Sequence, residues 1–140
     1  MDELHSAFMR YNAALLTLSA QTAAALDLTV SEMAACDHLH LDGPLTAGEL
    51  GRRVGLSSGS VTALVDRLAA RGFVERKPNP ADRRSVLIHY VPQDRSVVGR
   101  QYAVLQRLGA ALGELDGTDR AAVHAFLTRM AEAVMDAGDG

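Results

Sequence analysis

The sequence predicts a mainly α-helical fold that contains one small β-hairpin. Over most of the 140 residues, apolar side chains recur every three or four positions, which is the period of an amphipathic helix. That period changes only between residues 73 and 91, where two prolines separate short runs of β-branched and apolar residues. Aromatic residues make up 4% of the chain and Trp is absent, so the core must consist mainly of Ala, Leu and Val.

Two helices are predicted in the first part of the chain. The first spans residues 2–26, contains no Gly or Pro, and breaks near residues 27–29. Ser31 is the predicted N-cap of a second helix over residues 32–41, which the Gly-Pro pair at 43–44 ends. The apolar stripe of the first helix is long for a protein of this size, and it needs a partner to cover it.

Two shorter helices follow. Thr46 caps the third, over residues 47–54, and Glu49 is placed to complete a capping box. Ser57 caps the fourth, over residues 58–71. Glycines that favour a left-handed backbone follow the two helices: Gly55 and Gly72. Two short helices joined by a tight turn are typical of a helix-turn-helix.

The β-like segment supplies two strands. Residues 73–76 form the first, residues 77–82 form a turn with two prolines, and residues 85–91 return as a second strand that Pro92 ends. A two-stranded hairpin directly after a helix-turn-helix makes a winged helix-turn-helix.

The rest of the sequence predicts two more helices, over residues 95–115 and 119–137, with Thr118 as the N-cap of the last. The outer helices are too long and too apolar to belong to the small winged module, so we expect them to form a dimerisation bundle. The chain then divides into N-terminal dimerisation and linker helices at 1–43, a winged helix-turn-helix lobe at 44–92, and C-terminal dimerisation helices at 93–140.

The net charge of −3 would by itself argue against a nucleic-acid-binding protein, which is usually basic. The charge is unevenly distributed, however. Residues 44–92 hold eight Lys or Arg and four acidic residues, a net charge of +4, whereas the rest of the chain carries −7. A basic lobe that occurs twice in a dimer offers one basic face to phosphates.

Other features exclude several classes of protein. Cys36 is the only cysteine, so an internal disulfide is impossible, and no signal peptide or membrane span is recognisable. We therefore expect a cytoplasmic protein. The sequence has no nucleophile elbow, no zinc-protease helix and no phosphate-binding glycine loop. We expect no enzymatic activity, no catalytic residues, no cofactor and no bound metal.

The fourth predicted helix has small, hydroxylated residues on its outward face. Helix N-termini bind phosphate, and Ser and Thr hydroxyls can donate to phosphates or to base edges. The predicted DNA contacts of the helix-turn-helix are Thr46, Ser57, Ser58, Gly59, Ser60, Thr62 and Arg67. The alternative is that the serines are ordinary capping residues on a solvated face.

Three motifs lie in and after this helix: Leu64-Val65-Asp66-Arg67-Leu68, Gly72-Phe73-Val74 and Pro80-Ala81-Asp82-Arg83-Arg84. Together with the order of the flanking helices they resemble the MarR family of transcriptional regulators. The resemblance implies a homodimeric repressor that binds a pseudo-palindromic site in double-stranded DNA and is released by a small-molecule effector. It also implies a wing in the minor groove: Asp82 would hold an arginine in place, Arg84 would insert into the groove, and Arg83 would meet a phosphate or an internal acid.

The resemblance further implies a crevice between the dimerisation helices and the DNA-binding lobe, which takes a small aromatic or anionic effector. The residues expected near such a crevice are Phe8, Tyr11, Asn12, Met33, Asp37 and His38. Phe8 and Tyr11 lie three residues apart on one helical face, so both could line a pocket. The alternative is that these two aromatic residues belong to the dimer core.

A second functional hypothesis is a metal- or oxidant-sensing regulator on the same scaffold, built on Cys36, His38 and His40. On a helix, Cys36 and His40 share a face while His38 points elsewhere, so no compact set of three ligands follows. A buried, unreactive Cys36 is therefore the default expectation.

Overall fold

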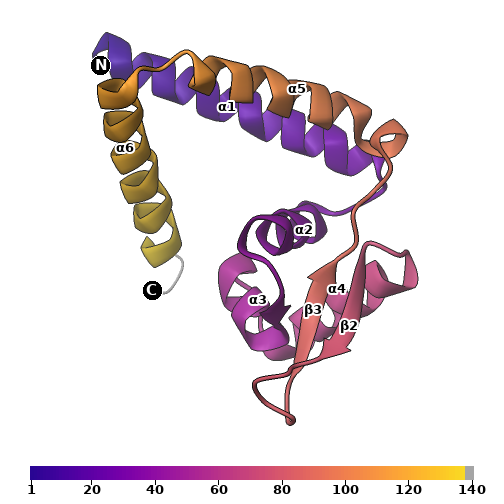
Figure 1. The fold of residues 1–140 in the computed structure, drawn as a ribbon. Helices are drawn as coiled ribbons and strands as arrows, with labels where there is room; N and C mark the ends of the chain where they lie inside the picture. Colours follow the sequence, from indigo (N-terminus) through magenta and orange to yellow (C-terminus); the bar gives the residue numbers. More distant parts are fainter. Residues whose placement is uncertain (138–140) are drawn as a thin grey trace.

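The computed structural model describes residues 1–137, with the side chains of all of these except residues 95–98 and 100. This part of the chain contains helices and a small antiparallel sheet, as predicted (Figure 1). The elements in chain order are α1 (Glu3–Ala25), α2 (Val30–Asp42), β1 (Leu45–Thr46), α3 (Ala47–Val54), α4 (Ser58–Ala70), β2 (Val74–Pro78), β3 (Val86–Tyr90), α5 (Arg95–Gly113) and α6 (Gly117–Asp136).

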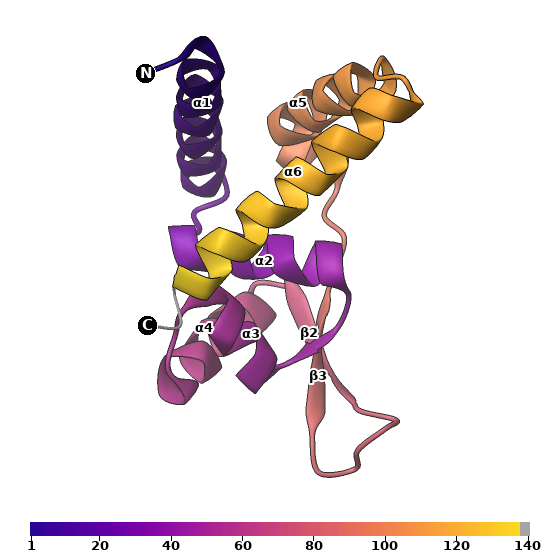
Figure 2. The same ribbon diagram turned by 90° about the vertical axis from the view of Figure 1, so that its left-hand side faces the viewer.

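The elements form two parts, which we call the lobe and the arm. The lobe consists of α2, α3, α4 and the sheet, and the loop between β2 and β3 projects from its lower end (Figures 1 and 2). The arm consists of α1, α5 and α6. Helix α1 contacts α5, and α6 turns back from the far end of α5. The two parts are joined by the α1–α2 connection and by the segment between β3 and α5.

The sheet has three strands in the order β1-β3-β2, so the wing contains one strand more than the predicted hairpin. β1 pairs antiparallel with β3, with Leu45 opposite Ile88, and β2 pairs antiparallel with the other edge of β3, with Arg76 opposite Ile88. β1 is only two residues long, and a pattern with a period of two cannot be recognised in so short a segment. It attaches the start of the helix-turn-helix to the wing.

The core lies in the lobe. The most deeply buried large side chains come from α3, α4 and β3: Leu50, Val61, Leu64, Val65, Leu68 and Ile88. Helix α2, which the sequence analysis grouped with the N-terminal arm, contributes Met33, Ala35 and Leu39 to this same core. In contrast, no residue of α6 is buried. The lobe thus has its own hydrophobic core, whereas the described residues of the arm form none of their own.

Two predicted N-caps are wrong. Helix α2 is capped by Thr29 rather than Ser31, because Glu32 at the third helical position completes a capping box with Thr29. Helix α6 is capped by Asp116 rather than Thr118; the Asp116 carboxylate accepts the Asp119 N–H at 2.9 Å.

The other helix boundaries follow the prediction closely. The Thr46–Glu49 capping box opens α3, and Ser57 caps α4. Gly55 and Gly72 take the left-handed backbone at φ 69° and 77°. Asp27 also does so, at φ 54°, where α1 ends with the Asp27 N–H bound to the Ala24 C=O and the Leu28 N–H bound to the Ala23 C=O.

Among the described residues no single helix is long and apolar enough to cross a membrane; α1 and α2 meet that length and composition only as a pair, with a bend of 102° between them.

Replacement of Leu68 by Ala tests the position of the core. Leu68 is 0% exposed, so Leu68→Ala should lower the free energy of unfolding by about 2–5 kcal/mol in urea denaturation. Leu41 at the end of α2 is 78% exposed and serves as the control, because Leu41→Ala should change stability by no more than about 0.5 kcal/mol. Equal losses from the two substitutions would contradict the assignment of the core.

Candidate nucleic-acid interface

The N-terminus of α4 is exposed and rich in hydroxyl groups, as the sequence predicts. The Ser57 hydroxyl accepts the Ser60 N–H at 3.3 Å and donates to the Ser60 hydroxyl at 3.0 Å. The Thr62 hydroxyl donates to the Ser58 C=O at 2.9 Å. Ser57 thus caps the helix, whereas Ser58 and Ser60 lie in its first turn. Each hydroxyl oxygen can also take part in further hydrogen bonds, so capping does not prevent a contact with DNA.

Thr46 and Gly59 differ in their surroundings. The Thr46 hydroxyl accepts the Glu49 N–H at 3.2 Å and so caps α3. Thr46 is half-buried. Gly59 is exposed, and a Cβ atom at this position would meet nothing within 4 Å. The backbone of α4 near its start is therefore open to close approach by a large partner.

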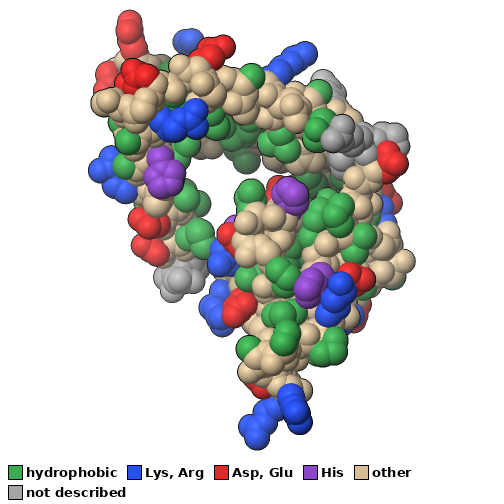
Figure 3. Space-filling view, viewed as in Figure 1, with side chains coloured by type: hydrophobic (Ala, Val, Ile, Leu, Met, Phe, Trp, Pro, Cys, Tyr) green, Lys and Arg blue, Asp and Glu red, His purple; other side chains and the backbone are tan. Residues whose placement is uncertain are grey.

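The loop between β2 and β3 presents two arginines at the far end of the lobe. Arg83 and Arg84 are both exposed, and basic side chains gather at the tip of this loop (Figure 3). The Asp82 carboxylate accepts the Arg84 N–H at 2.9 Å. Asp82 is thus bonded to the backbone from which the Arg84 side chain extends, and the role of holding an arginine in place that the resemblance implies stays a prediction.

Asn79 and Ser85 form hydrogen bonds at the base of this loop, and the sequence did not indicate them as functional residues. The Asn79 side-chain amide donates to the Ser85 hydroxyl at 2.9 Å, and its oxygen accepts the Ala81 N–H at 3.0 Å. An Asn before a Pro is a turn signal that could have indicated this role. These hydrogen bonds reduce the number of backbone conformations open to Arg83 and Arg84.

Asp66, in the leucine-valine-aspartate-arginine-leucine motif, has a structural role. Its carboxylate accepts a hydrogen bond from Arg76 of β2 at 2.5 Å. The ion pair ties the first wing strand to α4. The wing and the helix are therefore held to each other directly.

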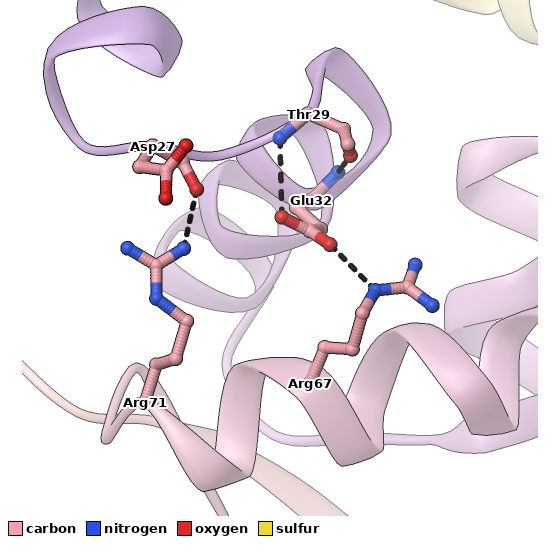
Figure 4. A network of polar contacts seen from close by, with 5 residues as sticks. All are labelled: Asp27, Thr29, Glu32, Arg67 and Arg71. Atoms are coloured by element: carbon pink, nitrogen blue, oxygen red, sulfur yellow. Dashed lines mark hydrogen bonds and ion pairs between the residues drawn. The ribbon is translucent and has the colours of Figure 1, made fainter.

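Arg67 lies at the other side of α4 and pairs with a buried carboxylate (Figure 4). Its Nε donates to Glu32 Oε1 at 2.8 Å, while Glu32 Oε2 accepts the Thr29 N–H at 3.1 Å. Burial on its own raises the pKa of Glu32, but the bonds from Arg67 and Thr29 and the charges of Arg67 and Arg71 outweigh it and lower that pKa below its ordinary value. The Arg67 side chain stays 56% exposed, and its terminal nitrogens point away from Glu32.

The ion pair predicts a pH-dependent contribution to stability. A carboxyl group with a lowered pKa stabilises the fold above its unfolded-state pKa, and this contribution is lost as the pH falls through the folded-state value. Glu32→Gln should therefore lower the free energy of unfolding by about 1–3 kcal/mol at neutral pH, and the difference from wild type should shrink below about pH 4.5.

Glu49→Gln is the matched control for this measurement. Glu49 holds the same place in the capping box of α3, and no arginine is among its described contacts. Urea unfolding of the three proteins across acidic pH separates the ion pair from the capping box. A difference between wild type and Glu32→Gln that stays constant down to pH values well below about 4 would contradict the ion-pair argument.

A cavity of about 320 Å³ lies between the end of α1, the helix α2, the strand β3 and the start of α5. Of the six predicted effector residues, Met33 and Asp37 line it. Burial against this wall raises the pKa of Asp37. Residues that the sequence analysis did not assign to a pocket also line it: Leu26, Leu28, Cys36, His40, Phe73, Tyr90, Pro92, Gln93, Gln101, Tyr102 and Leu105.

The other four predicted effector residues lie elsewhere. The Phe8 ring packs edge-on against Phe126 of α6, with 6.3 Å between the ring centroids. Tyr11 and Asn12 are exposed on α1, and His38 Nδ1 lies 3.5 Å from Asp42 Oδ2. Phe8 thus packs against α6 of its own chain, and its place in a dimer core stays a prediction.

Cys36 is buried in the cavity wall. Burial, helped by the charges of Asp37 and Glu32, raises the pKa of the Cys36 thiol to about 12. His40 shares this wall and packs edge-on against Tyr90, with 5.3 Å between ring centroids, whereas His38 is turned toward Asp42. In the described part of the chain no three His, Cys, Asp or Glu side chains come together to hold a metal ion.

The raised pKa predicts an unreactive thiol. At pH 8 only about one thiol in ten thousand is ionised when the pKa is about 12. Native protein should therefore react with a disulfide reagent at least about 100-fold more slowly than protein unfolded in urea, which serves as the control. Equal rates in the two states would contradict the burial of Cys36 and would favour the oxidant-sensing hypothesis.

Comparison with known proteins shows a similarity to one family over part of the chain and a shared fold over most of it. The sequence profile of the MarR family matches residues 26–85, which run from the end of α1 to the residue before β3 and include α4 and the wing loop. MarR of Salmonella typhimurium is 32% identical over 72 residues, which are 51% of this chain and 50% of that protein. The HTH-type transcriptional regulator YcgE of Bacillus subtilis is 54% identical over 66 residues, 47% of this chain and 43% of that protein.

Solved structures share the fold over almost the whole chain. A mutant of MepR from a multidrug-resistant Staphylococcus aureus clinical isolate has a TM-score of 0.70 at 17% identity, covering 96% of this chain and 99% of that one. Apo MarR from E. coli has a TM-score of 0.57 at 23% identity, covering 93% and 98%. The chain spans about half the length of the curated relatives named above. The family model covers residues 26–85, whereas the shared fold extends over the arm.

Proposed function

We propose that the chain is a homodimeric, sequence-specific regulator of transcription that binds double-stranded DNA through α4 and the wing. The observation that carries this proposal is the pair of exposed arginines, Arg83 and Arg84, on a loop whose backbone is fixed by Asp82 and Asn79. An arginine side chain at the end of a wing fits into a narrow minor groove, and the negative electrostatic potential of that groove attracts its charge. The exposed N-terminus of α4 would supply the recognition helix.

The fold supports this proposal. Another mutant of Staphylococcus aureus MepR, whose structure has a TM-score of 0.57 and 17% identity to this chain, is bound to an oligodeoxyribonucleotide. The net charge of +4 on residues 44–92 against −7 on the rest would direct the lobe, rather than the arm, toward phosphates.

The apolar surface of the arm supports the dimer. Large hydrophobic side chains are exposed along its three helices: Leu4, Met9, Leu16, Leu105, Leu112, Phe126, Leu127, Val134 and Met135. Hydrophobic side chains also face the hollow between arm and lobe (Figure 3). A monomer rarely exposes so much apolar surface, and a second copy of the chain would cover it.

We further propose that the protein is a repressor and that the cavity beside α2 holds a small aromatic or anionic effector. A cavity of about 320 Å³ is at the lower end of the range for small-molecule sites, and it combines apolar walls with a few polar groups. The structure of NadR, with a TM-score of 0.64 and 18% identity to this chain, contains 4-hydroxyphenylacetate. Met33 and Asp37 would contact the effector from α2.

Arg84→Ala tests the DNA-binding proposal. The operator is first obtained by selection from random-sequence DNA with the wild-type protein. Arg84→Ala should then weaken binding by about 1–3 kcal/mol and reduce the preference for A·T-rich over G·C-rich flanks, since the minor-groove contact is lost. Affinities are measured by titration at one salt concentration.

Arg129→Ala is the control, because Arg129 is an exposed arginine on α6, outside the lobe. It should leave both the affinity and the flank preference unchanged. An Arg84→Ala protein that binds as tightly as wild type, with the same flank preference, would show that the wing has no part in recognition.

A further inference from the structure

Arg71 joins the end of α4 to the end of α1 (Figure 4). It is the C-cap residue of α4, and its guanidinium donates to the main-chain carbonyl of Leu26 at 2.5 Å and to that of Asp27. The carbonyls at a helix C-terminus lack helical partners and carry partial negative charge. One guanidinium thus sits at the C-terminal ends of two helices, one from the arm and one from the lobe.

The residues after Arg71 hold the second connection between arm and lobe. The side-chain amide of Gln93 donates to the Gly72 C=O at 3.2 Å and to the Val91 C=O at 2.8 Å. The Val91 N–H donates to the Phe73 C=O at 2.9 Å. The chain crosses between lobe and arm twice, and both crossings are bound to residues 71–73, which follow α4 directly.

A third contact reaches the same junction one helical turn earlier. Arg67 binds Glu32, which lies in the first turn of α2 and is bonded to Thr29. Between these contacts lies Asp27, which holds a left-handed backbone at φ 54° although it is not a glycine. Figure 4 shows both arginines extending from α4 toward this one connection. At this junction Ala23, Leu26 and Leu28 also belong to the buried core. The polar contacts of Arg67 and Arg71 add a defined direction to that apolar packing.

We propose that Arg71 determines which half-site spacing the protein accepts. This inference depends on the proposed function as a DNA-binding dimer. In such a dimer the arms are joined to each other, so the angle between arm and lobe sets the distance and rotation between the two copies of α4. Recognition helices of a dimer must meet major grooves about 34–36 Å apart, and each added base pair shifts one half-site by about 3.4 Å along the DNA and rotates it by about 35°.

The test measures affinity as a function of half-site spacing. Operators carry two copies of the half-site selected by the wild-type protein, at the selected spacing and with one or two base pairs added or removed. The variants are Arg71→Met, which keeps the length of the side chain without its donors, and Gln93→Ala, which weakens the other crossing. Arg52→Met removes the charge of an exposed arginine on α3 and is the matched control.

Wild type and Arg52→Met should bind the selected spacing at least about ten-fold more tightly than a spacing changed by two base pairs. In Arg71→Met, the ratio of the affinity for the selected spacing to the affinity for the changed spacing should fall to about three-fold or less. In Gln93→Ala the same ratio should also fall. Loss of charge alone would weaken binding to all spacings equally, as expected for Arg52→Met. The ratio therefore separates an effect on geometry from an effect on affinity.

An Arg71→Met protein with the same spacing ratio as wild type would overturn the inference. If Arg71→Met does not fold, Gln93→Ala is used for the test in its place. A spacing ratio for Gln93→Ala that equals the wild-type ratio would then overturn the inference. A wild-type protein that selects no DNA, or that shows no preference for spacing, would instead overturn the proposed function on which the inference rests.

Discussion

The orientation of the lobe relative to the arm depends on the hydrogen bonds made by the Arg71 guanidinium and by the turn that follows Arg71. The lobe has a core of its own, and the arm is attached to it by only two segments of chain. Both segments are bonded to residues 71–73, and the buried carboxylate of Glu32 adds an ion pair with Arg67 at the same place. These directional contacts define the orientation of α4 beside the apolar packing of Leu26 and Leu28.

This arrangement explains the uneven distribution of burial. Leu64, Val65 and Leu68 on the inner face of α4 are almost fully buried, whereas α6 has no buried residue and the arm exposes large apolar side chains. The lobe, which holds most of the core, presents the exposed Arg83 and Arg84. The exposed apolar side chains of the arm would be covered by a second copy in the proposed dimer, and the cavity beside α2 lies where the two parts meet.

Features that depend on neighbouring residues could be predicted from the sequence. The Thr46–Glu49 capping box, the left-handed Gly55 and Gly72, and the order of helices and wing all follow local rules. Features that depend on distant residues could not. Glu32 and Arg67 are 35 residues apart, β1 is too short to show a period, and the pairing of Phe8 with Phe126 requires the turn between α5 and α6. The cavity was predicted only in part, because Tyr90 and His40 come together through the pairing of β3.

A hydroxyl-radical footprint of the protein on its selected operator tests the central claim most directly, namely that two lobes held at a fixed separation bind DNA through α4 and the wing. The predicted result is a symmetric footprint with two protected stretches about one helical turn apart, each followed on its outer side by protection of the minor groove where the wing lies. A single protected stretch, or protection without a minor-groove component, would contradict the claim.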